Sequence, residues 1–321
     1  MPVLDMPIEK LRTYQGRNPR PADFDAFWQK AKAELQAIDP DFKMVPADFH
    51  PPFAEAFELY FTGTRGARIH GRMLRPKNLR HQTPLEIRFH GLGGHAGEWP
   101  TYLGMAASGF TVLGMDCRGQ RGMSEDTGTR LGSTQGNSFF TRGLLQGPEH
   151  LYYRDVYLDC CRLAELAMAL PWVDASKTAV TGGSQGGGLA LVCAGLVPGL
   201  NRIVPVYPFL CDYRRVWEMD LALNAYHDIR DFLRAYDPTH QREEEFFTTL
   251  GYIDAQFFAE SITAQVQMHT GLLDNICPPS TQFAAYNKIS APKEVILYPD
   301  FGHETLPTYS ETAYKFLLDM I

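Results

Sequence analysis

Two observations predict an α/β fold for this chain of 321 residues, with a mostly parallel central sheet and helices on both of its faces. From residue 85 onward, short apolar segments typical of strands alternate with longer segments typical of helices. Such alternation builds parallel strands joined by right-handed crossovers. In addition, a glycine-rich turn around Ser184 links one of these strands directly to a helix.

The composition agrees with one folded domain over residues 1–321. Hydrophobic residues make up 45% of the chain and charged residues 21%, which is ample for a buried core and argues against disorder. The formal net charge of −7 disfavours nucleic acid and anionic membrane as partners, because both require clustered Lys and Arg. The charge does not argue against small neutral molecules as substrates.

The first 80 or so residues are predicted to form an extension ahead of the alternating region. A helix is expected over residues 22–37, with Phe24, Phe27, Trp28 and Ala31 on its buried face. Residues 56–61 and 68–74 then alternate with a period of two around a glycine-containing turn, which predicts a β-hairpin. We expect His70 to point outward from this hairpin.

The alternating region itself supplies the parallel strands. They are predicted at residues 85–90, 111–116, 178–181, 203–207, 264–269 and 294–298, with helices at 157–170, 189–196 and 282–289. The segment of about 208–262 breaks this rhythm, because it is aromatic-rich and helical without a strand. We expect it to form a cap over the carboxyl ends of the strands, where such sheets bind ligands. Crossover helices behind the sheet are the alternative.

The sequence also indicates a cellular location. The N-terminus lacks a basic segment followed by a long apolar run, and no stretch has the roughly 20 apolar residues of a membrane span. The six cysteines form no C-x-x-C pair and lie mostly in apolar segments, so buried reduced thiols are expected. A cytoplasmic protein without membrane contact is the resulting prediction.

The turn at Ser184 matches a nucleophile elbow. The pattern Gly182-x-Ser184-x-Gly186 follows a buried strand and precedes a helix, the context that this motif requires. Glycines on both sides leave space for the chain to reverse sharply and expose the serine hydroxyl. The alternative is a glycine-rich turn that only packs a helix closely against a strand.

A serine nucleophile needs a histidine base and an acid that orients it, in the chain order serine, acid, histidine on this type of sheet. Asp274 and His303 each follow a predicted strand in that order. The alternative interpretation of Asp274 is a residue that only forms a turn. Asp300 is another candidate for the acid, but its position is more typical of a turn residue. Glu304 is expected to brace the histidine loop. Because a second histidine is missing after His303-Glu304, no zinc motif exists, and neither metal nor cofactor is expected.

The oxyanion formed during acyl transfer needs two backbone N–H donors. One is predicted at Gln185, directly after the nucleophile. The other is predicted at Leu92, in the glycine-rich loop of residues 91–97 after the first parallel strand. The glycine spacing of that loop does not match the dinucleotide-binding pattern.

Three motifs in series give the chain a resemblance to a known family: Arg118-Gly119-Gln120, Gly182-Gly183-Ser184-Gln185-Gly186 and His303-Glu304. The chain resembles the acetyl xylan esterase / cephalosporin C deacetylase family, carbohydrate esterase family 7, over nearly its whole length. Further similarity lies in residues 23–28, 208–214 and 274–287. The resemblance implies an α/β-hydrolase fold and a cofactor-free serine esterase that removes acetyl groups from small acylated sugars and cephalosporin-type compounds.

The same resemblance assigns roles to single residues. It makes Ser184 the nucleophile, His303 the general base and Asp274 its orienting acid, and it gives Arg118 and Gln120 a structural role near the nucleophile loop. Relatives often form hexamers whose active sites face an internal cavity, so a homo-oligomer is expected. The family commonly has Tyr where this chain has Leu92, which leaves the N–H in place but removes an aromatic wall. A peptidase or other acyl hydrolase of this fold, and a non-catalytic binding protein, are the alternative functions.

Overall fold

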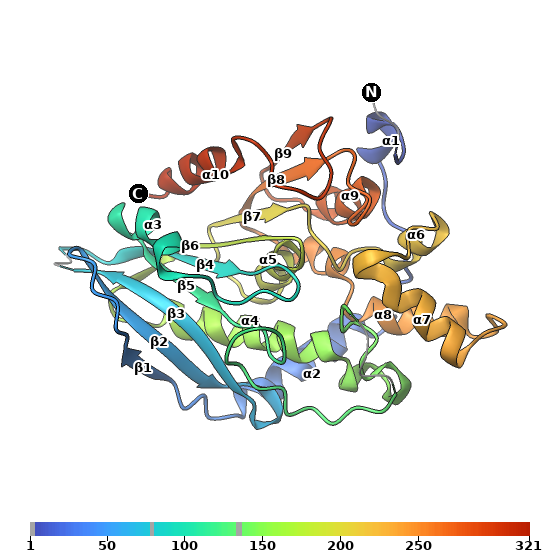
Figure 1. Ribbon diagram of the computed structural model, residues 1–321, viewed down its shortest axis with the longest axis horizontal. Helices are drawn as coiled ribbons and strands as arrows, with labels where there is room; N and C mark the ends of the chain where they lie inside the picture. The colour runs from blue at the N-terminus through green and yellow to red at the C-terminus, as the bar shows by residue number, and fades with distance from the viewer. Residues whose placement is uncertain (1–3, 78–79, 133–136) are drawn as a thin grey trace.

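The computed structural model describes residues 4–77, 80–132 and 137–321, and its centre is a nine-stranded sheet in the order β1-β2-β3-β5-β4-β6-β7-β8-β9 (Figure 1). The strands are β1 (Lys43–Pro46), β2 (Ala54–Thr62), β3 (Arg68–Pro76), β4 (Thr83–Phe89), β5 (Thr111–Met115), β6 (Val173–Gly183), β7 (Arg202–Val206), β8 (Gln265–Gly271) and β9 (Lys293–Tyr298). Pairing is antiparallel from β1 to β5 through β3, and parallel from β5 onward. The predicted mostly parallel α/β fold is confirmed.

The predicted hairpin is β2 and β3, which pair from Ala54 opposite Pro76 to Thr62 opposite Arg68. It does not stand apart, because β3 also pairs with β5 and thereby extends the parallel sheet. The edge strand β1 was not predicted. Its four residues are mostly exposed and end at Pro46, so it has neither a buried face nor a long alternating pattern.

Consecutive strand residues face opposite sides of the sheet and enter different cores. In β5, Leu113 belongs to one core and Val112 to the other, and in β6 the same holds for Val180 and Ala179. The larger core contains residues of α2, α4 and α5, whereas the smaller one contains residues of α3 and α10. The sheet is therefore covered by helices on both faces.

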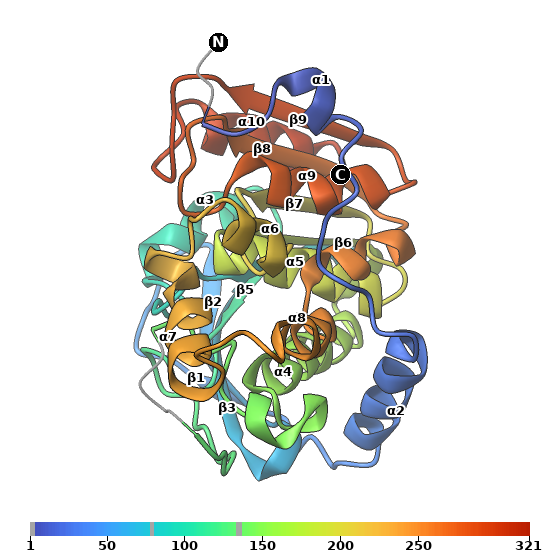
Figure 2. The same cartoon turned by 90° about the vertical axis from the view of Figure 1, so that its right-hand side faces the viewer.

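The helices follow the chain order α1 (Ile8–Leu11), α2 (Phe24–Gln36), α3 (Leu103–Ala107), α4 (Tyr152–Met168), α5 (Gln185–Leu196), α6 (Tyr213–Glu218), α7 (His227–Tyr236), α8 (Glu243–Gly251), α9 (Pro279–Lys288) and α10 (Tyr309–Leu318). Helix α2 has the predicted buried face and lies outside α4 (Figure 2). The N-terminal segment runs from α1, beside α9, to α2 on the far side of the molecule. None of the described helices is long and apolar enough to cross a bilayer.

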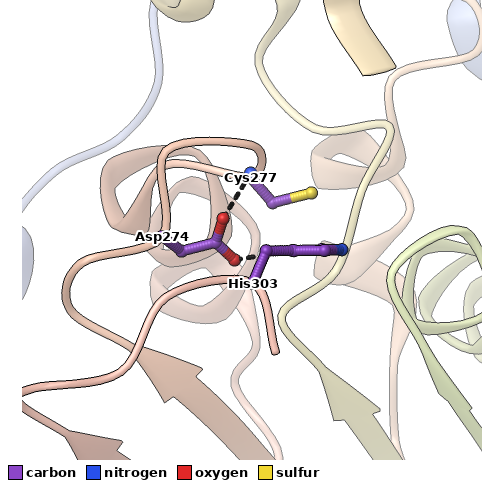
Figure 3. A group of neighbouring side chains, drawn as sticks. All are labelled: Asp274, Cys277 and His303. Atoms are coloured by element: carbon purple, nitrogen blue, oxygen red, sulfur yellow. Dashed lines mark hydrogen bonds and ion pairs between the residues drawn. The ribbon is translucent and has the colours of Figure 1, made fainter. Parts of the chain in front are cut away.

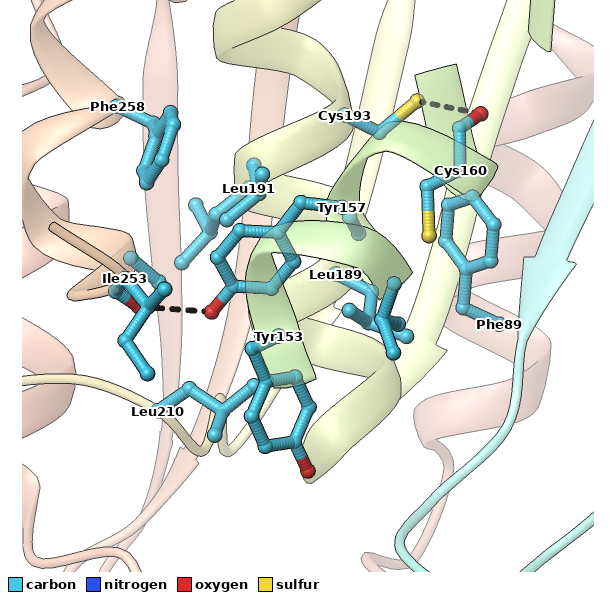
Figure 4. Close-up of a cluster of buried hydrophobic side chains, with 14 of the residues drawn as sticks. Phe89, Tyr153, Tyr157, Cys160, Leu189, Leu191, Cys193, Leu210, Ile253 and Phe258 are labelled. Carbon is cyan, nitrogen blue, oxygen red and sulfur yellow. Dashed lines mark hydrogen bonds between the residues drawn. The ribbon is translucent and has the colours of Figure 1, made fainter. Parts of the chain in front are cut away.

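Helix α4 begins five residues before its predicted start at residue 157. The prediction was late because the first turns of the helix carry charged residues, which a hydrophobic pattern assigns to solvent but which are buried here. Asp155 and Asp159 are fully buried, and Arg154 is nearly so. Farther along, Tyr157 packs between α5 and the segment after β7, where its hydroxyl donates to the Ile253 carbonyl at 2.8 Å (Figure 4). Because these buried residues are charged, the hydrophobic pattern did not indicate the start of the helix.

The chain between β7 and β8 contains α6, α7 and α8 together with short 3₁₀ helices, and the described elements there are all helical. Its Asp212 lies fully buried and contacts the N-terminal segment. The Asp212 carboxylate accepts hydrogen bonds from the Tyr14 hydroxyl at 2.8 Å and from the backbone N–H groups of Arg17 and Asn18 at 2.9 and 2.8 Å. The N-terminal segment is therefore fastened to this insertion.

The expectation that His70 points outward from its strand was wrong. Its side chain is 3% exposed and lies between two carboxylates, with Nδ1 2.6 Å from Asp116 and Nε2 2.7 Å from Glu58. Alternation with a period of two assigned His70 to a solvent face, but on that face Glu58 of β2 and Asp116, in the loop after β5, lie against its ring. An imidazole between two carboxylates satisfies the polar groups that such burial requires.

Candidate active site

Ser184 lies in the sharp turn between β6 and α5, with φ of 57° and ψ of −120°. This positive φ is a strained conformation for a residue with a side chain, and it is characteristic of a nucleophile elbow. The two motif glycines are required by space. A Cβ at Gly186 would lie 2.0 Å from the Phe89 carbonyl oxygen, and one at Gly182 would lie 2.5 Å from the backbone of Gly186.

Three predicted residues from distant loops meet at this turn. The Ser184 Oγ lies 3.0 Å from His303 Nε2, and His303 Nδ1 lies 2.8 Å from an oxygen of Asp274. In the tautomer that satisfies both contacts, Nδ1–H donates to the carboxylate and Nε2 accepts from the serine hydroxyl. This is the arrangement in which an imidazole can remove the serine proton.

The backbone around Asp274 fixes its carboxylate. The residue follows β8 and is fully buried, and its second oxygen accepts from the N–H groups of Ile276 and Cys277 at 2.9 and 2.8 Å. Hydrogen bonds to the charged form stabilise a buried carboxylate. His303 follows β9 and packs against the Tyr207 ring, whose centroid lies 4.5 Å from its own. Acid and base are therefore held by β8, β9 and β7 together.

The two rival acids lie elsewhere on the histidine loop. Asp300 and Glu304 are both exposed. The Glu304 carboxylate accepts from the Gly302 N–H at 3.0 Å, so it contacts the backbone just before His303 and not the imidazole. The role of Glu304 in bracing the histidine loop stays a prediction, to which this contact gives a geometric basis.

Cys277 brings a thiol close to the three residues and was not among the predicted site residues. Possible ligand atoms of Asp274, Cys277 and His303 lie within 4.8 Å of one another (Figure 3). Such residue types can bind zinc. Here, however, Asp274 and His303 already bind each other, and burial raises the pKa of the Cys277 thiol well above its usual value. A neutral thiol and an engaged acid–base pair suit proton transfer better than metal ligation.

The loop after β4 carries the predicted oxyanion donor Leu92 and is fixed by His90. The His90 Nδ1–H donates to the Gly91 carbonyl at 2.7 Å, and Nε2 accepts from the Cys117 N–H at 3.0 Å. Burial lowers the pKa of His90, which favours the neutral ring that these two contacts need. Leu92 lines the same cavity as Ser184.

Gln120 connects that loop to the elbow. Its side-chain oxygen accepts from the Gly93 N–H at 2.8 Å, while its amide nitrogen donates to the Gln185 side chain at 2.7 Å. The Gln185 oxygen also accepts from the Tyr153 hydroxyl at 2.8 Å. The two residues predicted to supply oxyanion donors, Leu92 and Gln185, therefore stand on loops that one side chain ties together.

The loop that carries the Arg118-Gly119-Gln120 motif is itself attached to α4. Arg118 is fully buried and forms a two-point ion pair with Asp159 of α4, at 2.7 and 2.6 Å. Gly119 has φ of 63°, which favours glycine. Asp116, at the start of the loop, accepts from the Ala96 N–H at 2.6 Å and thereby holds the end of the 91–97 loop as well.

Ser184 opens into a cavity of about 480 Å³. Its lining consists of Gly91, Leu92, Asn137, Ser138, Ser184, Asn224, Ala225, Ile276 and His303. Asn224 and Ala225 come from the insertion between β7 and β8, so this segment reaches the site. The wall residues Asn137, Ser138 and Asn224 were not predicted, because none belongs to a recognisable motif: Asn137 and Ser138 lie in irregular chain, and Asn224 begins a short 3₁₀ helix.

Comparisons with known proteins agree with this geometry. The family model described as acetyl xylan esterase (AXE1) matches residues 1–320. The acetyl esterase Axe7A of Xylanibacter ruminicola is 30% identical over 319 residues, which are 97% of this chain and 68% of that protein.

Two solved structures extend the likeness to three dimensions. Acetyl xylan esterase 1 from Thermoanaerobacterium sp. JW/SL YS485 is 46% identical, with a TM-score of 0.96 over 98% of this chain and 99% of the other. The acetyl xylan esterase from Paenibacillus sp. R4 is 38% identical, with a TM-score of 0.93 over 98% of this chain and 100% of the other.

Proposed function

The chain belongs to the acetyl xylan esterase family and is a carboxylic ester hydrolase of the α/β-hydrolase fold; on that premise we propose which residues catalyse its reaction and on which esters. The substrates proposed are small acetylated sugars, such as acetylated xylo-oligosaccharides, and cephalosporin C-type compounds. The observation that carries the proposal is the hydrogen-bonded series Ser184, His303 and Asp274 at the edge of an open cavity.

The reaction is an acyl transfer in two steps. The Ser184 Oγ attacks the acetyl carbonyl while His303 Nε2 takes the hydroxyl proton, and the proton then passes to the departing sugar oxygen as the ester bond breaks. Water attacks the resulting acetyl-serine, His303 again takes a proton, and acetate leaves as Ser184 recovers its hydrogen. Asp274 keeps the imidazole in the required tautomer and stabilises its charged form.

The negative charge that develops on the carbonyl oxygen needs preorganised donors. We assign them to the backbone N–H groups of Leu92 and Gln185. The assignment is supported by the position of Leu92 in the wall of the Ser184 cavity and by the Gln120 bridge between the two loops. The catalysis proposed here uses protein groups and water alone.

Replacement of the nucleophile tests the assignment. Ser184→Ala should lower turnover of p-nitrophenyl acetate and of acetylated xylo-oligosaccharide by about 10⁴- to 10⁶-fold, because it removes the atom that forms the covalent bond. Rates are measured at saturating substrate, and circular dichroism checks the fold. A variant that keeps more than a tenth of the parental rate would refute Ser184 as nucleophile.

We further propose that the helical segment of about 208–262 caps the active site, which is supported by Asn224 and Ala225 in the cavity wall.

The proposed assembly is a homohexamer. Exposed apolar side chains at Met123, Leu131 and Leu145 support association between copies. Light scattering should then give a mass about six times the 36.2 kDa of one chain. A cytoplasmic location also stays a proposal, supported by six cysteines that are buried free thiols.

A further inference from the structure

The cavity beside Ser184 has two kinds of wall. Its lining includes the apolar residues Leu92, Ala225 and Ile276 and the polar residues Asn137, Ser138 and Asn224. The acetyl group of an ester offers only a methyl group and a carbonyl, and the carbonyl oxygen is taken by the proposed oxyanion donors. Of the two halves of the substrate, only the alcohol half then has groups left to form hydrogen bonds with the polar wall.

Ser138 is the most informative member of this polar wall. It is fully buried, and its Oγ has no hydrogen-bond partner among residues 4–77, 80–132 and 137–321. Buried hydroxyl groups are normally paired, because an unpaired one loses its bonds to water without replacement. A hydroxyl that lines a ligand cavity can find that partner in the ligand.

The position of Ser138 is fixed by the insertion. The carboxylate of Asp228, on α7, accepts from the N–H groups of Asn137 and Ser138 at 2.9 and 3.2 Å. Asp228 is itself buried, so these two hydrogen bonds attach residues 137 and 138 to α7. Asn224 has a positive φ of 46°, a conformation that Asn tolerates better than most residues. The polar wall is thus held in place before a ligand arrives.

We propose that Ser138, assisted by Asn137 and Asn224, is a specificity-determining residue that binds a hydroxyl group of the alcohol half of the ester. The enzyme then distinguishes acetyl esters of polyhydroxylated alcohols from plain acetyl esters. This inference rests on the proposed function, since it concerns the substrate of the same Ser184 site. Asn137 and Asn224 are exposed and form the rim, while Ser138 makes the deep contact.

A matched pair of substrates tests the inference: trans-2-hydroxycyclohexyl acetate, which has a free hydroxyl beside the ester, and cyclohexyl acetate, which has none. Ser138→Ala should lower kcat/KM for the hydroxylated ester by about fivefold to tenfold, the effect of one neutral hydrogen bond, and change the plain ester by less than about twofold. A monoacetylated methyl xyloside should behave like the hydroxylated ester. Ser176→Ala, at an exposed position, is the matched control.

Asn224→Ala gives a second reading at an exposed site and should shift the same ratio in the same direction, by about twofold to fivefold. Equal losses on both esters in the two variants would show a structural role, and unchanged ratios would show no contact; either result overturns the inference. Failure of the proposed function looks different. In that case the parental enzyme itself would leave sugar acetates intact, or Ser184→Ala would retain activity.

Discussion

A single side chain, Gln120, joins the two loops that carry the proposed oxyanion donors. It accepts from the Gly93 N–H and donates to the Gln185 side chain, both within 2.8 Å. It is not among the described residues that line the Ser184 cavity, and it has no ionisable group. Gln120 is therefore a positioning residue, whose effect on the reaction passes through the backbone of its neighbours.

Replacing Gln120 should slow the chemical step and leave substrate binding nearly unchanged. We expect Gln120→Met, which keeps the length but removes every hydrogen bond, to lower kcat by about 10- to 100-fold with less than a threefold change in KM, because small displacements of transition-state donors are costly. Steady-state kinetics on p-nitrophenyl acetate measure both constants. Gln82→Met, at the exposed surface, serves as control. A rise in KM at parental kcat would contradict the positioning role.

At this scale the sequence was informative where chemistry imposes a pattern. The elbow around Ser184 is constrained by glycine spacing, and the order of Asp274 and His303 follows from strand ends, so these three residues could be named in advance. Cys277 and Ser138 could not, because a buried thiol or hydroxyl gains its meaning only from neighbours distant in sequence. The prediction for His70 failed for the same reason, since its carboxylate partners are Glu58 of β2 and Asp116, in the loop after β5.

Among the elements, β8 carries a buried histidine that makes the fold sensitive to acid. His269 is fully buried between the Tyr298 hydroxyl of β9 and the Gln267 side chain, at 3.1 and 3.2 Å, with the Tyr309 ring of α10 against its edge. Burial lowers the pKa of His269 to about 4, because the charged ring would lose its hydration. Three elements thus enclose a ring that stays neutral in the folded protein.

The direction of the resulting pH effect follows from linkage. The unfolded chain binds a proton at His269 near its ordinary pKa of about 6.5, whereas the folded chain binds it only near 4, so stability is lost as the pH falls through that window. At pH 5 this residue should lower the free energy of unfolding by about 2 kcal/mol relative to pH 8. In His269→Gln, urea unfolding should show a pH dependence smaller by that amount. The exposed His50→Gln should match the parent, and an unchanged slope in His269→Gln would disprove the effect.

Helices and strands could be predicted from the sequence where one face, or every face, of the element is buried. The six parallel strands and the hairpin were located because apolar runs and alternation mark them directly, although β6 begins at Val173, five residues before its predicted start. Strand β1 was missed because it is short and exposed, and α4 was begun late because ion pairs bury its charges. Helices α3 and α10, which cover the second face of the sheet, were not predicted.

In the whole molecule, the N-terminal segment connects regions that lie far apart in sequence. It passes α9, is fastened to Asp212 of the insertion, and ends in α2 against α4. The Tyr14 hydroxyl and two backbone N–H groups all depend on that single buried carboxylate. Nothing in the sequence indicated that the N-terminal segment contacts Asp212, because the two lie about 200 residues apart.

Removing the anchor should destabilise the entire fold. Asp212→Ala leaves the buried Asn18 N–H and the half-buried Arg17 N–H without an acceptor, and we expect a loss of about 2–4 kcal/mol in the free energy of unfolding by urea. Tyr14→Phe removes only one donor and should lose about 1 kcal/mol. Equal stability of Asp212→Ala and the parent would show that the segment is held by other contacts.

Leu92 has a practical consequence for directed evolution. Its proposed part in catalysis belongs to the main chain, while the residue also lines the cavity beside Ser184. A saturation library at this codon should therefore yield active clones with nineteen amino acids and fail only with proline, which lacks the amide hydrogen. Variation there would alter which carboxylic acid is released, whereas the neighbouring glycines of the elbow, crowded by carbonyl groups, should tolerate almost no exchange.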